Sequence, residues 1–239
     1  MPKRLSPQIV KTEIEELIKK ATIAEEPNLA NRLKDLMSWI AKEKDGFLMS
    51  RRYVLDLLTE LILDCQFWLN LKSLTPEQKQ ILYAQEQITP VERYWYDFLF
   101  PQWFNERDPK LPTWKQKIMN NQFTRNDEKI VNSLAQEIEA CGGSCLWNYL
   151  LDLSMATDLV VAGNKNISLC VQLTQTHVNQ WVDKRKKWEG ALDYWGIQRG
   201  LIISYNPSNL NTAFLASAIV EKADTLPNIS YNEYTARSI

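Results

Sequence analysis

A polar pattern in the carboxyl-terminal half is where residue types and spacing first suggest chemistry. Asp158 opens an apolar run that ends at Ala162, and Gln172 and Thr174 lie in a second apolar run over residues 168–174. Side chains alternate between the two faces of a strand, so positions 172 and 174 point the same way, as a two-residue active-site signature requires. The sequence therefore predicts that the three polar side chains lie side by side on a sheet.

These residues belong to a series of expected elements that begins near residue 127. The series is a helix capped by Asn126 or Asp127 and ended by Gly142-Gly143, strands at 145–153, 157–162 and 168–174, a helix at 179–194, a strand at 200–205 and a helix at 213–223. The turn residues 163–166 predict that the second and third strands form a hairpin. The strand at 200–205 is continuously apolar, which is typical of a strand buried on both faces.

This order resembles the core of the restriction-endonuclease-like superfamily, the PD-(D/E)xK nucleases, which runs α-β-β-β-α-β. The resemblance covers residues 127–206, approximately. In that family an acidic residue opens the second strand, an acid-x-lysine triplet lies on the next strand, and an acid on the first helix often assists. The matching positions hold Asp158, the triplet Gln172-Leu173-Thr174, and Glu128. The resemblance implies a Mg²⁺-dependent nuclease site with Asp158 as a metal ligand.

The chemistry of that site is eroded in this chain. Gln172 stands where the family has a carboxylate, and a hard cation such as Mg²⁺ prefers carboxylate oxygens to a neutral amide. Thr174 stands where the family has the lysine that orients water or stabilises phosphorane charge. Losing one such positioned group typically costs on the order of 10²–10⁴ in rate. We therefore expect a nuclease fold that binds nucleic acid or a protein partner without efficient cleavage and without a cofactor.

Two substitutes keep an active, Mg²⁺-dependent endonuclease open as an alternative. Lys165 or Lys184 can take the place of the missing lysine, and Asp152 adds a carboxylate if its strand runs beside Asp158. A third interpretation is a non-catalytic assembly protein whose aromatic segment 94–114 is an interface for a protein subunit. Burial of those aromatic side chains is the competing use of the segment.

Each site residue also has a structural explanation. An aspartate at a strand start is commonly a turn or cap residue. Gln172 and Thr174 are equally suited to a half-exposed sheet surface. Glu128, in the first turn of its helix, interacts favourably with the helix dipole.

Lys184, Arg185, Lys186 and Lys187 form the one dense basic run in the chain. At about 100° per residue, four apolar side chains share a stripe of that helix, namely Trp181, Trp188, Leu192 and Trp195. We expect the tryptophans to be core residues, with residues 184 and 185 bordering the stripe and residues 186 and 187 pointing away. The basic run is then either a solvated helix face or a set of phosphate contacts beside the nuclease-like site.

The amino-terminal half is almost free of glycine, and its apolar residues recur at helical spacing. Thr75 and Thr89 each begin a capping box followed by proline, which predicts two helix starts. Prolines 101, 109 and 112 are expected to stop any long helix. The expected fold class is α/β (α+β), with a helical amino-terminal region at 1–120 and a small mixed β-sheet flanked by helices at 121–239.

Composition limits the remaining function classes. The formal net charge is −1, so anion recognition needs a local patch rather than a global field. No segment approaches the ~18 uninterrupted apolar residues of a membrane span, and the amino terminus has no signal sequence, so we expect a cytoplasmic protein without a membrane partner. Four scattered cysteines and one histidine, His177, do not make a zinc set, and we expect structural thiols and a loop histidine.

Overall fold

The computed structural model describes residues 4–123, 128–175 and 181–236, which form two compact units. The first unit comprises residues 1–88 and 96–124, and the second comprises residues 89–95 and 125–239. As the sequence predicts, a helical amino-terminal half is followed by a mixed sheet interleaved with helices, and this sheet has five strands. Within the described residues, no helix is both long and apolar enough to cross a membrane.

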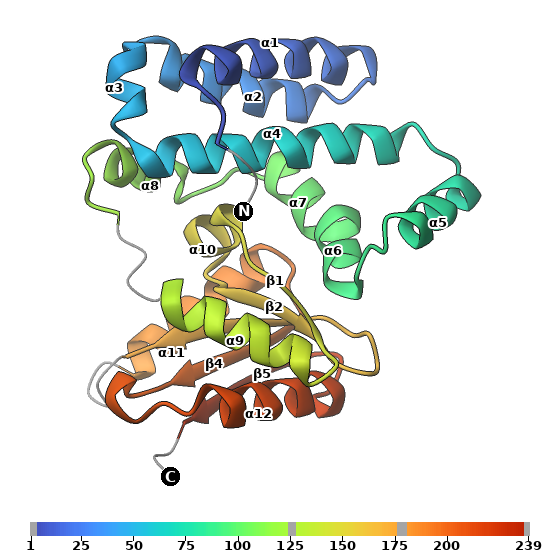
Figure 1. The fold of residues 1–239 in the computed structure, drawn as a ribbon, viewed down its shortest axis with the longest axis vertical. Coiled ribbons are helices and arrows are strands. Elements are labelled where there is room, and N and C mark those ends of the chain that lie inside the picture. The colour runs from blue at the N-terminus through green and yellow to red at the C-terminus, as the bar shows by residue number, and fades with distance from the viewer. Residues whose placement is uncertain (1–3, 124–127, 176–180, 237–239) are drawn as a thin grey trace. The chain divides into compact units, whose positions relative to one another are not determined.

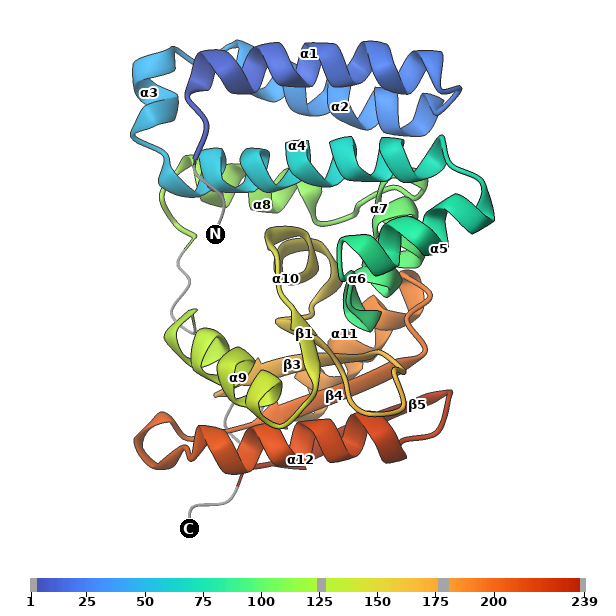
Figure 2. The same ribbon diagram turned by 45° about the vertical axis from the view of Figure 1, so that its right-hand side comes forward.

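The first unit is built from helices. These are α1 (Pro7–Ile23), α2 (Pro27–Ala41), α3 (Asp45–Met49), α4 (Arg52–Lys72), α5 (Pro76–Gln85), α7 (Phe100–Asn105) and α8 (Leu111–Met119). Helix α1 packs against both α2 and α4, as Figures 1 and 2 show. Aromatic residues at 100–114 contribute to the interior of this unit, where Phe100 and Phe104 contact Trp68 edge-on.

Both predicted capping boxes are confirmed. The Thr75 hydroxyl accepts from the backbone N–H of Gln78, and the Gln78 side chain accepts from the backbone N–H of Thr75. Thr89 and Glu92 make the same reciprocal pair at the start of α6 (Pro90–Tyr94). Each box satisfies two backbone donors that a helix start would otherwise leave unpaired.

The expectation that prolines stop every long helix in this region is wrong at Pro101. The chain stays helical from α6 through a π-helical turn at Trp95–Leu99 into α7, and Pro101 is near the start of α7. A proline inside a regular α-helix removes a hydrogen bond and collides with the carbonyl four residues earlier. The π turn changes that hydrogen-bond pattern just before the proline, so the helix continues.

The second unit contains the sheet. Its elements are α6, α9 (Glu128–Ala140), β1 (Ser144–Leu146), α10 (Tyr149–Met155), β2 (Leu159–Ala162), β3 (Leu169–Thr174), α11 (Trp181–Tyr194), β4 (Arg199–Ser204), a 3₁₀ turn (Pro207–Asn209), α12 (Thr212–Thr225) and β5 (Ser230–Thr235). The strand order is β1-β2-β3-β4-β5. Strands β1, β2 and β3 pair antiparallel, which confirms the predicted hairpin, whereas β3, β4 and β5 pair parallel.

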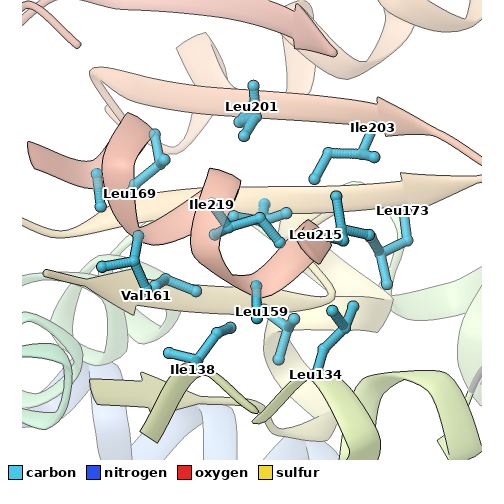
Figure 3. Packing of buried hydrophobic residues seen from close by; sticks show 14 of the residues in the cluster. Leu134, Ile138, Leu159, Val161, Leu169, Leu173, Leu201, Ile203, Leu215 and Ile219 are labelled. Atoms are coloured by element: carbon cyan, nitrogen blue, oxygen red, sulfur yellow. The ribbon is translucent and has the colours of Figure 1, made fainter. Parts of the chain in front are cut away.

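Helices cover both faces of this sheet. Helices α9 and α12 lie side by side on one face, where their apolar side chains meet alternate residues of β2, β3 and β4 (Figure 3). Helix α11 lies on the other face, against β4. A Cβ at Gly200 would come within 2.4 Å of the Leu192 side chain and 2.8 Å of the Trp188 indole, so the close approach of α11 requires glycine there.

Two expectations about the second unit are wrong. The strand expected at 145–153 ends at Leu146, because Asn148 caps a helix by accepting from the backbone N–H of Leu151 at 2.9 Å. Asp152 therefore lies on α10 and not on a strand beside Asp158. The sheet also has a fifth strand, β5, that the apolar pattern did not predict.

Candidate functional site

Asp158 lies immediately before β2, and both its backbone and its side chain form hydrogen bonds with residues of β3. Its backbone N–H donates to the carbonyl of Val171 at 2.8 Å, which continues the β2–β3 ladder by one residue. Its carboxylate Oδ2 accepts from the backbone N–H of Leu173 at 2.6 Å and from the side-chain amide of Gln172. Asp158 and Gln172 therefore lie opposite each other on neighbouring strands and are in direct contact.

The Gln172 side chain presents a hydrogen-bond donor to that carboxylate. Its Nε2 donates to Asp158 and also to the carbonyl of Leu173, the latter at 3.0 Å. A carboxylate at position 172 would instead place a second negative charge against Asp158, which a divalent cation would have to bridge. The amide stabilises the single carboxylate without any metal.

A lysine reaches the neighbouring position from helix α11. The ammonium of Lys184 donates to the hydroxyl of Thr174, with 2.5 Å between Nζ and Oγ1, and Thr174 is buried. Lys165, the other lysine considered, lies in the turn between β2 and β3, at the opposite end of the hairpin from Asp158. Of the two lysines, Lys184 is the one that the fold brings to the triplet strand.

Glu128 and Asp152 are placed on helices outside the contacts just described. Glu128 is the first residue of α9, and α9 packs on the face of the sheet opposite to α11. Asp152 is in the first turn of α10. Toward the end of β3, the fold brings the predicted residues together in two contacts, Asp158 with Gln172 and Thr174 with Lys184. We call these four residues the Lys184 end.

The donor set at the Lys184 end does not fit a magnesium ion. Mg²⁺ is bound in proteins through carboxylates, with water and phosphate oxygens completing an octahedral shell. Here the Asp158 carboxylate faces an amide N–H and a backbone N–H, and the neighbouring ammonium is cationic. Among the residues that the structure describes, no group of three His, Cys, Asp or Glu side chains could hold a metal ion.

The basic run divides into different environments. Arg185 is held in ion pairs by Glu189 at 2.8 Å and by Glu233 of β5 at 2.9 Å. The hydrogen bond that Arg185 donates to the Glu189 carboxylate is the main reason that the pKa of Arg185 is raised above its ordinary value. Lys186 and Lys187 are exposed. The run is therefore not one uniform basic patch, because residue 184 contacts the sheet and residue 185 is already neutralised.

The expectation that the tryptophans on the apolar stripe of α11 are core residues is confirmed for Trp188 and Trp195 and is wrong for Trp181. Trp188 and Trp195 are core residues, and the Trp195 indole donates to the carbonyl of Ser154 at 2.9 Å. Trp181 is only partly buried and donates to the Glu233 carboxylate at 2.8 Å. It extends the polar contacts between α11 and β5 rather than the core.

The cysteines are free thiols in the structure. Burial is the first cause that raises the pKa of Cys145 and of Cys170 to about 12, so both remain neutral near pH 7 and are poor nucleophiles. His177 and the predicted caps Asn126 and Asp127 lie outside the described residues.

Two hydroxyl residues near this end were not predicted from the sequence. Ser204 and Thr235 are the last residues of β4 and β5, and the parallel pairing aligns both with Thr174. The available signal was a polar residue ending a strand, which is too common to single out a site.

Comparison of the chain with protein-family models, with curated proteins and with solved structures finds no match.

Proposed function

We propose that this chain is a nuclease-fold protein that binds nucleic acid at the Lys184 end and does not cleave it efficiently. The observation that carries the proposal is the contact pattern of the triplet strand. The Gln172 side-chain amide donates a hydrogen bond to the Asp158 carboxylate, and the Thr174 hydroxyl accepts a hydrogen bond from the Lys184 ammonium. A positive charge suited to phosphate is retained there, and the second carboxylate needed for a metal is absent from the triplet.

The element order supports the nuclease-like fold. The second unit runs α9, β1, β2, β3, α11 and β4, which is the α-β-β-β-α-β order of the restriction-endonuclease-like core. Helix α10, inserted between β1 and β2, and strand β5, added at the edge, are additions to that order. Asp158 opens the second strand, and the 172–174 triplet ends the third, as the family pattern requires.

The chemistry separates binding from cleavage. A lysine ammonium contributes to nucleic-acid binding by neutralising a backbone phosphate, and this contribution needs no metal. Cleavage of a phosphodiester by this family requires a water that is held and activated by a metal ion. To bind such a metal, the Lys184 end offers one carboxylate, that of Asp158, and two N–H donors already bond to it. We therefore expect binding to persist where turnover is lost.

The proposal is tested with the purified full chain and fluorescein-labelled single- and double-stranded DNA and RNA. Binding is measured by fluorescence anisotropy at several salt concentrations, and cleavage is measured on gels with Mg²⁺ or Mn²⁺. We expect salt-sensitive binding and no cleavage. Lys184→Met should weaken binding, whereas Lys165→Gln, which removes the same charge at the other end of the β2–β3 hairpin, should have a smaller effect.

An active enzyme would give a different pattern. Metal-dependent cleavage that is abolished by Asp158→Ala and by Lys184→Met, but kept in Lys165→Gln, would replace this proposal with an endonuclease whose lysine has moved to α11. The contact of Lys184 with Thr174 is the observation that favours this alternative. Absence of both binding and cleavage would leave neither nucleic-acid function standing.

A further inference from the structure

Three hydroxyl side chains lie in a row across the carboxyl ends of the parallel strands. Thr174 of β3 pairs with Ser204 of β4, and Ser204 pairs with Thr235 of β5. Residues paired in register on parallel strands point to the same face, and adjacent strands are about 4.8 Å apart. We call Thr174, Ser204 and Thr235 the hydroxyl row.

The hydroxyl row faces α11 and not the apolar core. Its members alternate with Leu173, Ile203 and Tyr234, which pack in or against the cluster formed with α9 and α12. Lys184 of α11 contacts the Thr174 end of the row. Within the described part of the chain, Thr174 is the one hydrogen-bond acceptor of the Lys184 ammonium, and the hydroxyls of Ser204 and Thr235 make no hydrogen bond.

Neighbouring carboxylates are already compensated. Asp158 accepts from the Gln172 amide and the Leu173 N–H, as described above. Glu233, which precedes Thr235 by two residues on the same face of β5, accepts from Arg185 and from the Trp181 indole. The donors named above for these two carboxylates do not include Lys184, Ser204 or Thr235.

We infer that Lys184 and the hydroxyl row form a binding site for a tetrahedral phosphate group. The ammonium supplies the charge, and the hydroxyls of Ser204 and Thr235 supply neutral, directional hydrogen bonds. Ligands of mixed α/β sheets commonly bind beyond the carboxyl ends of the parallel strands, and this row is at that edge. The inference rests on the proposed function for its natural ligand, which is a phosphodiester of the nucleic-acid backbone.

The phosphate site is tested first with inorganic phosphate alone. The backbone amides of the ¹⁵N-labelled full chain are followed by NMR while phosphate is added into the millimolar range, with chloride at matched ionic strength as the control. We expect saturable shifts at residues 174, 204 and 235, lost in Lys184→Met and retained in Lys165→Gln. Shifts that chloride reproduces, or that Lys184→Met retains, would overturn the inference.

The second arm uses a labelled single-stranded oligonucleotide and separates charge from hydroxyl contacts. Lys184→Met should reduce the magnitude of the slope of log K against log salt by about 0.7, because one phosphate contact is lost. Ser204→Ala should weaken binding by roughly three- to tenfold with the slope unchanged, because a neutral hydrogen bond releases no counterion. Ser217→Ala, on the exposed side of α12, is the matched control and should bind like the parent chain.

The two arms distinguish the inference from the proposed function. Phosphate shifts at the hydroxyl row without oligonucleotide binding would keep the phosphate site and reject nucleic acid as its ligand. Oligonucleotide binding with unchanged affinity in Ser204→Ala, and no phosphate shifts at the row, would keep the proposed function and reject the hydroxyl row as the contact.

Discussion

The two ends of the sheet in the second unit both hold a buried or half-buried cation, but they use it differently. At one end, Arg199 begins β4, and its side chain is buried. All five of its N–H donors reach backbone carbonyls, those of Pro227, Ile167, Ser168, Ala223 and Leu226. At the other end, the Lys184 ammonium has one acceptor within the described residues, the Thr174 hydroxyl.

This contrast separates a cation that is held within the fold from the cation that we propose binds phosphate. A guanidinium has five donors in a fixed geometry, so five well-placed carbonyls leave it no capacity for a ligand. An ammonium has three donors, and one hydroxyl acceptor leaves two of them available to a ligand or to water. The number of acceptors that each cation has, rather than its positive charge, is what supports the phosphate site that we propose at Lys184.

The largest expected effect is at the end of the sheet that holds Arg199, which we call the structural end. Arg199→Met removes five hydrogen bonds to buried or partly buried carbonyls, including two near the end of α12. We expect a loss of about 3–5 kcal/mol in the free energy of unfolding, measured by urea denaturation of the full chain. Arg185→Met, at a partly exposed ion pair, is the control and should cost less than about 1 kcal/mol. Equal losses in the two variants would contradict the distinction between the two ends.

A second change converts the Lys184 end toward a metal site. Gln172→Glu replaces the amide that donates a hydrogen bond to Asp158 with a second carboxylate. Like charges that lie directly opposite each other on paired strands are destabilising. We expect a loss of about 1–2 kcal/mol at neutral pH, part of which Mg²⁺ restores because it binds only the folded variant. Thermal unfolding with and without Mg²⁺ measures both effects.

The control for this change is Gln198→Glu, an exposed residue that precedes β4 at the other end of the sheet. Neither it nor the parent chain should be stabilised specifically by Mg²⁺. A parent chain that Mg²⁺ stabilises as strongly as Gln172→Glu would mean that the unchanged site already holds the ion, against the donor set described above.

Much of the candidate site follows from strand alternation alone. The apolar runs around Asp158 and Gln172 place both residues on neighbouring strands of a hairpin, and a two-residue period puts Thr174 on the same face as Gln172. The contact of Lys184 with Thr174 does not follow, because it depends on how closely α11 approaches β4. That approach is permitted by Gly200, whose role becomes visible only when the helix and the strand are seen together.

The unpredicted elements have equally local causes. Residues 149–155 are apolar enough to suit a buried strand or a buried helix, and the cap at Asn148 decides for the helix. Strand β5 carries polar residues on a half-exposed edge, so it lacks the apolar run by which β4 was recognised. The role of Arg199 could not be predicted from the sequence, because the acceptors of its side chain named above are backbone carbonyls. Every residue has such a carbonyl, so no residue type marks the site.

The smallest expected effect tests the structural end by pH. Asp224 accepts from the backbone N–H groups of Asn164 and Lys165, and the hydrogen bond from Lys165 is the first cause that lowers the pKa of its carboxyl from the ordinary 3.8. A lowered folded-state pKa contributes stability above the ordinary pKa that is lost as the pH falls through the folded-state value. Asp224→Asn should therefore lower the urea midpoint slightly at pH 7, and the difference from the parent chain should disappear in acid.

The control is Asp183→Asn on the exposed side of α11, which removes the same charge away from the 163–166 turn and should leave the urea midpoint at pH 7 unchanged. If the Asp224→Asn difference persisted unchanged below the ordinary pKa, the carboxylate charge would not be what holds the 163–166 turn. The loss of an acceptor geometry, which asparagine only partly reproduces, would then explain it. A difference that vanishes in acid would instead show that the Asp224 charge stabilises the fold at this end of the sheet. The N–H donors of the turn then have their acceptor within the fold, whereas the Lys184 ammonium has one acceptor among the described residues.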